Sequence, residues 1–169
     1  HARAPFASTQ APYFYRFKIG AIEATVVSDG PFSLGDPAAT LNGTSKEEVS
    51  KILSEHFIPT EKLMIEQNVL IINTGDKVVM FDTGLGDFQF FGKTSGRLLN
   101  SMAAAGIRPQ DVDVVCLTHA HVDHAGGLVG EDGKPVFPNA TIYINEAEYE
   151  FYTDEAKLPT APAGLKRQI

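Results

Sequence analysis

One stretch of the sequence decides the fold and the chemistry: Thr118-His119-Ala120-His121-Val122-Asp123-His124-Ala125-Gly126-Gly127. Three of the five histidines of the protein lie within it, together with one aspartate. Imidazole nitrogens and carboxylate oxygens are the usual protein ligands of zinc and similar divalent ions. The stretch follows an apolar run and ends in a Gly-Gly pair, which is a typical setting for a ligand loop. It therefore predicts a metal site, or half of one, over the alternative of a solvated histidine-rich loop.

The spacing of the four ligand-type residues favours two ions over one. In an extended segment, residues two apart project the same way, so His119 and His121 can meet one ion. Asp123 and His124 follow where the chain has to turn, so they can face a neighbouring ion. Two ions a few ångströms apart can clamp and activate a shared water. We expect two divalent ions, zinc first, with manganese, cobalt or iron also compatible with these ligands.

The composition describes an ordinary globular chain with an acidic balance. The 169 residues are 43% apolar and 21% charged, which is enough to bury one core. The net charge of -7 argues against nucleic acid and against an anionic membrane surface as partners. It favours a small, neutral or apolar substrate. No apolar run is long enough to span a bilayer. The single cysteine, Cys116, excludes an intrachain disulfide and fits a buried, inert thiol.

The two ends of the chain differ from its middle in composition. Residues 1–12 are rich in Ala, Pro, Ser and Thr and predict a flexible N-terminal arm, followed by one domain over residues 13–169. The chain starts at His1 without a methionine, so we expect a processed or trimmed form. Such a start is compatible with a removed export signal, and a periplasmic or secreted location is favoured over a cytoplasmic one.

Hydrophobic periodicity and turn residues predict alternating strands and helices, and therefore an α/β fold. Strands are expected at 13–18, 22–27, 68–73, 77–81, 113–117 and 140–144, and helices at 45–57, 97–105 and from 145 onward. Ser28-Asp29-Gly30-Pro31 is expected to break the sheet and to open a loop that runs to about residue 43. Asn145 and Glu148 have the spacing of a capping box for the last helix. His56, near the end of the first helix, is interpreted as a surface residue rather than a ligand.

The chain resembles the metallo-β-lactamase-fold hydrolases. The resemblance is carried by the stretch from Thr118 to Gly127 and by the upstream Asp82-Thr83-Gly84. It extends over nearly the whole chain from about Tyr13, and it is greatest to the methyl parathion hydrolase branch, which includes lactonase-type enzymes. The cues for that branch are Val27-Ser28-Asp29-Gly30, Phe91-Gly92-Lys93-Thr94-Ser95-Gly96-Arg97-Leu98 and Phe137-Pro138-Asn139-Ala140.

The resemblance implies a role for each matching residue. His119 and His121 would bind the first metal, and Asp123 and His124 the second, with Asp123 also as the catalytic residue. Asp82 would brace the ligands from outside, although a turn-initiating Asp before Gly84 is the alternative. Two aromatic residues would line the substrate pocket, with core packing as an equal alternative: Phe91 and Tyr152. Phe88 and Phe90 are weaker candidates for the same role.

The resemblance also implies that the site is incomplete. The family fold is an αββα sandwich, and this chain corresponds to its N-terminal half. A complete binuclear site takes one more histidine for each metal and a bridging aspartate from the second half, whereas no histidine follows His124. We therefore expect a truncated, nicked or partial form of a longer protein, which needs a C-terminal half or a second fragment to complete the site. A self-sufficient domain is the alternative, and a homodimer is also possible.

The implied function is that of a metal-dependent hydrolase. A metal-bound hydroxide would attack a small apolar ester, lactone or phosphotriester, and these three substrates are not separable by the sequence. Cleavage of β-lactams is less favoured, because the branch cues point elsewhere. The alternative is a non-catalytic metal-binding module or pseudo-enzyme that needs a partner chain to complete its fold. Nuclease and redox functions rank well below the hydrolase, since basic surface and flavin- or iron-binding features are absent from the sequence.

Overall fold

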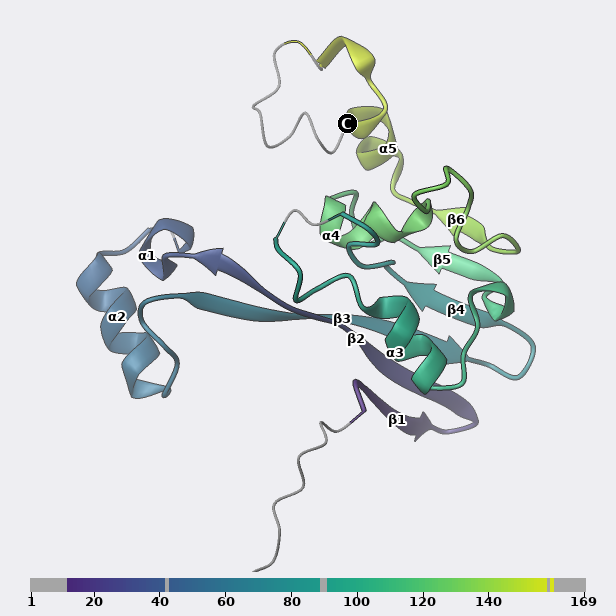
Figure 1. Cartoon of the computed structure of the whole chain (residues 1–169), viewed down its shortest axis with the longest axis horizontal. Coiled ribbons are helices and arrows are strands. Elements are labelled where there is room, and N and C mark those ends of the chain that lie inside the picture. Colours follow the sequence, from purple (N-terminus) through teal and green to yellow (C-terminus); the bar gives the residue numbers. More distant parts are fainter. Residues whose placement is uncertain (1–11, 42, 89–90, 158, 160–169) are drawn as a thin grey trace, which may run out of the picture.

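The structure is a computed structural model of the chain, and it describes residues 12–41, 43–88, 91–157 and 159. A single six-stranded sheet carries helices along one side, which confirms the α/β class (Figure 1). Residues 1–11 of the predicted N-terminal arm lie outside the described residues, as do Phe90 and residues 160–169. Among the described helices, none has the length and hydropathy needed to cross a membrane.

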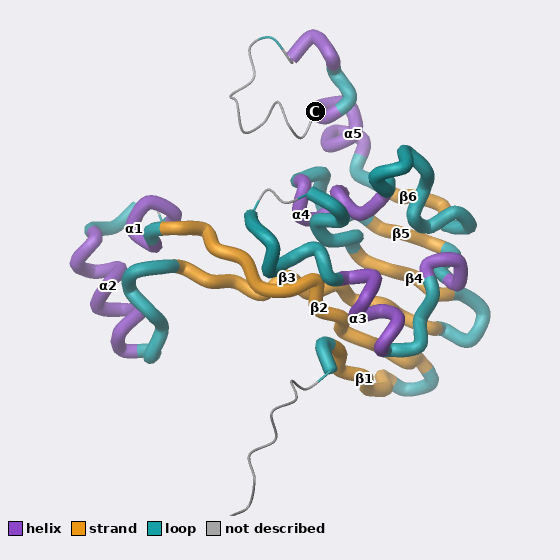
Figure 2. The backbone as a smooth tube through the Cα atoms, in the orientation of Figure 1, coloured by secondary structure: helices purple, strands orange, loops and turns teal. Residues whose placement is uncertain are grey.

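The strands follow one another across the sheet in chain order (Figure 2). They are β1 (Phe14–Ile19), β2 (Ile22–Gly35), β3 (Leu63–Asn73), β4 (Val78–Phe81), β5 (Val114–Cys116) and β6 (Thr141–Tyr143). The pairs from β1 to β4 are antiparallel, whereas β4, β5 and β6 run parallel. Because parallel neighbours end at the same edge, the loops that leave β4 and β5 are brought side by side.

The helices are short, and two of them were not predicted. They are α1 (Pro37–Thr40), α2 (Lys46–Glu55), α3 (Leu98–Ala104), α4 (Val122–Ala125) and α5 (Glu146–Tyr152). Ser45 caps α2 as its sequence predicts, since its hydroxyl accepts a hydrogen bond from the backbone N–H of Glu48 at 3.2 Å. The four-residue helices α1 and α4 escape prediction because a single turn leaves almost no periodic signal.

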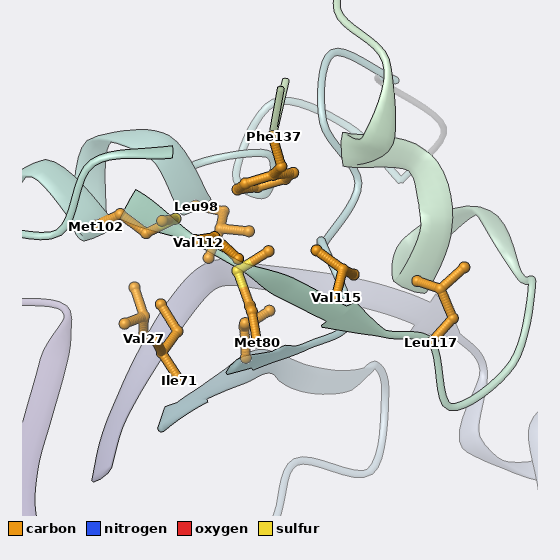
Figure 3. Packing of buried hydrophobic residues seen from close by; sticks show 10 residues of the cluster. Val27, Ile71, Met80, Leu98, Met102, Val112, Val115, Leu117 and Phe137 are labelled. Carbon is orange, nitrogen blue, oxygen red and sulfur yellow. The ribbon is translucent and has the colours of Figure 1, made fainter. Parts of the chain in front are cut away.

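The main core lies between the sheet and the elements on its covered face (Figure 3). Alternate residues of the strands point to this face, and α3 closes it with Leu98 and Met102. Phe137, from the segment before β6, covers the centre of the cluster. The strand residues in it are Val27, Val69, Ile71, Met80 and Val115, each at most 2% exposed.

The opposite face of the sheet is apolar as well, but it is partly open. In each strand, the residues that alternate with the core residues point to this opposite face. They include Leu70 and Phe81, both only half-buried. The aromatic rings at the two edges are more exposed: Tyr15 in β1 is 71% exposed and Tyr143 in β6 is 59% exposed. Apolar residues on both faces are typical of a sheet that lies between two layers.

The predicted sheet break at Ser28-Asp29-Gly30-Pro31 is wrong. Strand β2 continues to Gly35 and pairs with β3, with register shifts between Ser28 and Gly30 and between Ser33 and Gly35. A β-bulge accommodates the extra residue, and Pro31 is tolerated because this part of β2 pairs with β3 alone. The two strands thus form a long hairpin that projects from the body and carries α1 and α2 at its far end (Figure 1).

The bulge has a function within the fold, because it turns Asp29 into the interior. The Asp29 side chain is 0% exposed and accepts hydrogen bonds from the backbone N–H groups of Leu85 at 3.0 Å and Leu98 at 2.8 Å. Burial raises the pKa of this carboxyl group, and the backbone donors partly offset that effect. Asp29 therefore fastens the loop after β4 to the start of α3, beside the predicted site.

Candidate metal centre

The predicted metal loop, residues 118–127, begins directly after β5 at the edge where β4 also ends. His121 has an extended backbone (φ -63°, ψ 154°) and is the N-cap of α4. One helical turn then carries Asp123 and His124. The turn rotates these two side chains back toward the first two histidines, so the four ligand-type residues form one cluster.

The distances within the cluster are short. His119 Nε2 lies 2.9 Å from His121 Nδ1, and the rings of His119 and His124 have their centroids 3.9 Å apart. His124 Nε2 lies 3.2 Å from Asp123 Oδ2. The structure therefore brings together all four residues that the sequence predicts as ligands.

Asp82 lies beneath the cluster, where it contacts both ends of the loop. Its Oδ1 accepts from the backbone N–H of Thr118 at 2.7 Å, and its Oδ2 lies 2.9 Å from His124 Nδ1. The residue is 7% exposed and has a left-handed backbone (φ 66°), which Asp tolerates better than most residues. Because Asp82 engages Nδ1, the Nε2 atom of His124 is left to face the cluster, as expected for a residue that orients a metal ligand.

The electrostatics of the cluster follow from these contacts. Burial opposes the charge of Asp82 and Asp123, but hydrogen bonds from His124 outweigh it and hold the pKa of both carboxyl groups below the usual range. Burial likewise opposes protonation of His124, yet its bonds to the two carboxylates raise its pKa to about 9. Burial and the neighbouring histidines lower the pKa of His119. A cation is thus already favoured between Asp82 and Asp123, and a metal ion that binds His124 has to displace its proton.

We expect Asp82→Asn to weaken zinc binding by roughly 10–100-fold, as loss of a residue that orients a ligand typically does. The asparagine keeps the shape and tolerates the left-handed backbone, but it removes the negative charge beside His124. Competition with a zinc-chelating dye measures the affinity. Asp76→Asn, in an exposed turn, is the matched control. Equal zinc affinity in both variants would contradict a bracing role for Asp82.

Glycines allow the metal loop to press against the loop after β4. A Cβ on Gly127 would overlap the carbonyl oxygen of Thr83, and one on Gly126 would lie 2.6 Å from the carbonyl oxygen of Leu85. In the resulting contact, the backbone N–H and the hydroxyl of Thr83 both donate to the carbonyl of His124, at 2.7 and 2.9 Å. The Gly-Gly pair is therefore required for a backbone-to-backbone contact that holds a predicted ligand in place.

The donors fit a divalent metal in type, whereas the geometry is that of a partial site. Among the described residues, no group of three or more His, Cys, Asp or Glu side chains has an arrangement able to hold an ion. Two imidazole nitrogens on one tetrahedral zinc stand roughly 3.3 Å apart, given bonds of about 2.05 Å. The two nitrogens of His119 and His121 are closer than that at 2.9 Å, so the two rings have to move apart before an ion can bind both.

The two aromatic residues predicted for substrate binding lie in different places. Tyr152, on α5, faces the cluster: its ring meets the ring of His121 edge-on, with centroids 6.1 Å apart. Phe91 stacks on Phe32 of the hairpin at 4.3 Å, in a small apolar cluster that also contains Val122 of α4. Phe91 therefore packs behind the metal loop, and a direct role in substrate binding stays a prediction for both residues.

A cavity of about 510 Å³ adjoins the metal loop and is lined by Ala120, Val122 and Ala125 of that loop, but by none of the four ligand-type residues. Its walls are mainly apolar, and Phe88, named above as a weaker candidate, is among them. Among the described residues, the charged ones that line it are Asp87 and Glu131, both exposed. The cavity therefore suits an uncharged, apolar group and does not suit an anion.

Two residues that hold the metal loop were missed by the sequence analysis. The side-chain amide of Gln67, on β3, donates to the carbonyl of Asp123 at 3.0 Å. The carboxylate of Glu148 accepts from the backbone N–H of Ala120 at 2.9 Å. The predicted capping box is thus only half confirmed: Asn145 caps α5 through the N–H of Ala147, but Glu148 is directed at the metal loop. For Gln67 a signal existed, since it interrupts the alternating apolar row of β3.

Comparison with solved structures places this arrangement among known hydrolases. A hydrolase of the β-lactamase superfamily, AbOPH, superposes with a TM-score of 0.83 at 27% identity, over 94% of this chain and 53% of its own. AidC, described as a dizinc quorum-quenching lactonase, superposes with a TM-score of 0.80 at 28% identity, over 91% of this chain and 56% of its own. The chain therefore spans about half the length of these solved structures.

Sequence comparison agrees with the structural likeness. A segment of 54 residues is 33% identical to a probable metallo-hydrolase of Methanocaldococcus jannaschii, over 32% of this chain and 24% of that protein. The family model of the metallo-β-lactamase superfamily matches residues 65–165, which is more than half of the chain and includes the loop after β4 and the whole metal loop. The chain belongs to the metallo-β-lactamase superfamily.

Proposed function

We propose that this protein contributes the first half of a binuclear metal centre that hydrolyses a small, uncharged ester or lactone, with neutral phosphotriesters as the related alternative. The observation that carries the proposal is the convergence of four ligand-type side chains on one loop, whose residues Ala120, Val122 and Ala125 also line an apolar cavity of about 510 Å³. The superfamily and the hydrolase and lactonase neighbours support the reaction class.

In this proposal, His119 and His121 hold one ion, and Asp123 and His124 hold the other. When bound, such ions lower the pKa of a coordinated water to about 7 and stabilise negative charge on the oxygen of the substrate. The chain itself supplies orientation. Asp82 and Thr118 fix His124, and Thr83 holds the carbonyl of the same residue, so that its Nε2 atom stays directed at the cluster.

The cavity supports the choice of substrate. Its apolar walls would accept an acyl or aryl group of the substrate. Asp87 and Glu131 at this cavity, together with the net charge of -7, disfavour an anion such as a carboxylate-bearing β-lactam. The cavity walls select substrates by the polarity of the group that they contact and not by the bond that is hydrolysed. They therefore do not discriminate a lactone from a phosphotriester.

We further propose that a second layer, from a longer form of this chain or from a second fragment, covers the open face of the sheet. Apolar residues such as Leu70 and Phe81 on that face support this, because large exposed apolar surfaces are costly in an isolated domain. The greater length of the similar solved structures supports it too. The remaining metal ligands would come from that layer.

The test uses the purified full-length protein, with the second layer proposed above. It measures hydrolysis of a neutral aryl ester, an N-acyl homoserine lactone and a neutral phosphotriester before and after treatment with a chelator. We expect turnover to fall at least about a hundredfold on chelation, because the ions supply several kcal/mol of charge stabilisation. Zinc, manganese or cobalt should restore it. Turnover that is indifferent to the chelator would contradict the proposal. Zinc binding without any hydrolysis would favour the non-catalytic module instead.

A further inference from the structure

A buried amide interrupts an otherwise apolar row on the covered face of β3. Ile65, Val69 and Ile71 point to this face, and Gln67 stands between them at 8% exposure. Its neighbours Ile65 and Val69 belong to two separate apolar clusters, so Gln67 lies where the two cores meet. A polar side chain in such a place costs free energy unless it makes a specific hydrogen bond.

That hydrogen bond is made to the metal loop. The amide of Gln67 donates to the carbonyl of Asp123 at 3.0 Å, across 56 residues of sequence. The acceptor belongs to the peptide unit that joins Asp123 to His124. Opposite Gln67 in the ladder is Gly30, which has no side chain to compete for the same space. The central part of the β2–β3 hairpin thus holds the second pair of ligand-type residues.

Helix α5 makes a corresponding contact from the other side. The carboxylate of Glu148 accepts from the N–H of Ala120 at 2.9 Å, in the peptide unit that joins His119 to Ala120. No residue of α5 is buried, and both this hydrogen bond and the ring contact of Tyr152 with His121 connect the helix to the loop. A helix attached in this way is suited to orient the loop rather than to support the core.

We propose that Gln67 and Glu148 are positioning residues, each of which fixes the backbone between the ligands of one metal. Glu148 sets the peptide between His119 and His121, the expected ligands of the first ion. Gln67 sets the peptide between Asp123 and His124, the expected ligands of the second ion. The inference rests on the proposed metal centre, and it adds that the two halves of the centre are held independently, one by the hairpin and one by α5.

The two contacts differ in a way that makes them separable by substitution. Glu148 acts as an acceptor, so Glu148→Gln retains an acceptor oxygen, whereas Glu148→Ala removes it. Gln67 acts as a donor, so Gln67→Met removes the donor while it fills nearly the same space. If Gln67 mattered only for packing, Gln67→Met would bind zinc like the unsubstituted chain. If the charge of Glu148 mattered rather than its acceptor oxygen, Glu148→Gln would behave like Glu148→Ala.

The test is a zinc titration of the full chain followed by NMR of ring-labelled histidines, with signals assigned from single histidine substitutions. We expect Glu148→Ala to raise the zinc concentration needed to shift the His119 and His121 signals roughly tenfold, with little change at His124. We expect Gln67→Met to raise it roughly tenfold at His124, with little change at the other two. Glu148→Gln should remain within about twofold of the unsubstituted chain.

Control variants and thermal melts distinguish a positioning role of Gln67 and Glu148 from a general unfolding of the variants. Glu150→Ala on exposed α5 and Asn68→Ala on β3 should leave all three histidine signals unchanged. Melting in chelator should show each variant folded before zinc is added. If Glu148→Ala and Gln67→Met raised the zinc concentration needed to shift the signals equally at all three histidines, the inference would be overturned. The proposed metal site would not be affected by that result. An unsubstituted chain whose histidines ignore zinc would overturn the proposed function as well.

Discussion

Replacing Asp123 by asparagine is expected to lower hydrolysis about a thousandfold. The substitution keeps the size of the side chain but removes its negative charge, which the structure places 3.2 Å from His124 Nε2. The pKa of Asp123 lies below its usual range, so at neutral pH the carboxylate is fully charged and available to a cation. Loss of several kcal/mol of charge stabilisation at one ion corresponds to about three orders of magnitude in rate.

The measurement is kcat/KM for the best neutral ester or lactone, together with the zinc content of the purified protein. Asp132→Asn is the control, because Asp132 is exposed and pairs with Lys134 at 3.0 Å, away from the cluster. Zinc content should fall in the Asp123 variant and stay unchanged in the control. A rate within about threefold of the unsubstituted protein would show that Asp123 is neither a ligand nor a catalytic residue.

Replacing Gly127 by alanine should cost about 3 kcal/mol of folding free energy, because a Cβ at this position overlaps the carbonyl oxygen of Thr83. The clash is between a Cβ, whose position is fixed by the backbone of residue 127, and a backbone carbonyl oxygen. No side-chain rotation can therefore relieve it. To make room, the loop after β4 has to separate from the metal loop. That movement would break the hydrogen bonds from Thr83 to the carbonyl of His124.

Thermal unfolding measures this effect, and for a chain of this size we expect the melting temperature to fall by roughly 10 °C. Zinc affinity should fall as well, since His124 moves with its carbonyl. Gly130→Ala is the matched control. Gly130 also has no left-handed backbone, and its Cβ would meet the end of the Asp132 side chain at 3.3 Å and the next atoms only at ordinary contact distances of 3.8 and 3.9 Å. A melting temperature equal to that of the control would show that the contact between the two loops is looser than described.

Most elements could be predicted from the sequence because their signals are local. Ser45 and Glu48 define the start of α2, and the alternating residues of β3 and β4 define a hairpin around Thr74-Gly75-Asp76. The sheet break at Ser28-Asp29-Gly30-Pro31 was wrong because a β-bulge depends on the partner strand. A sequence that looks like a turn can stay in a sheet when β3 lies beside it and the extra residue, Asp29, finds buried donors.

The sequence by itself determined which residues are the predicted metal ligands, because HxHxDH places four ligand-type side chains within six residues. Only the tertiary structure decided how they are held. Asp82, Gln67 and Glu148 lie 28 to 56 residues from the atoms they contact. Asp82 is in the loop after β4, Gln67 is on β3 and Glu148 is on α5. Hydrogen bonds over such separations leave no periodic trace, because they depend on which elements pack together and on nothing in the intervening chain.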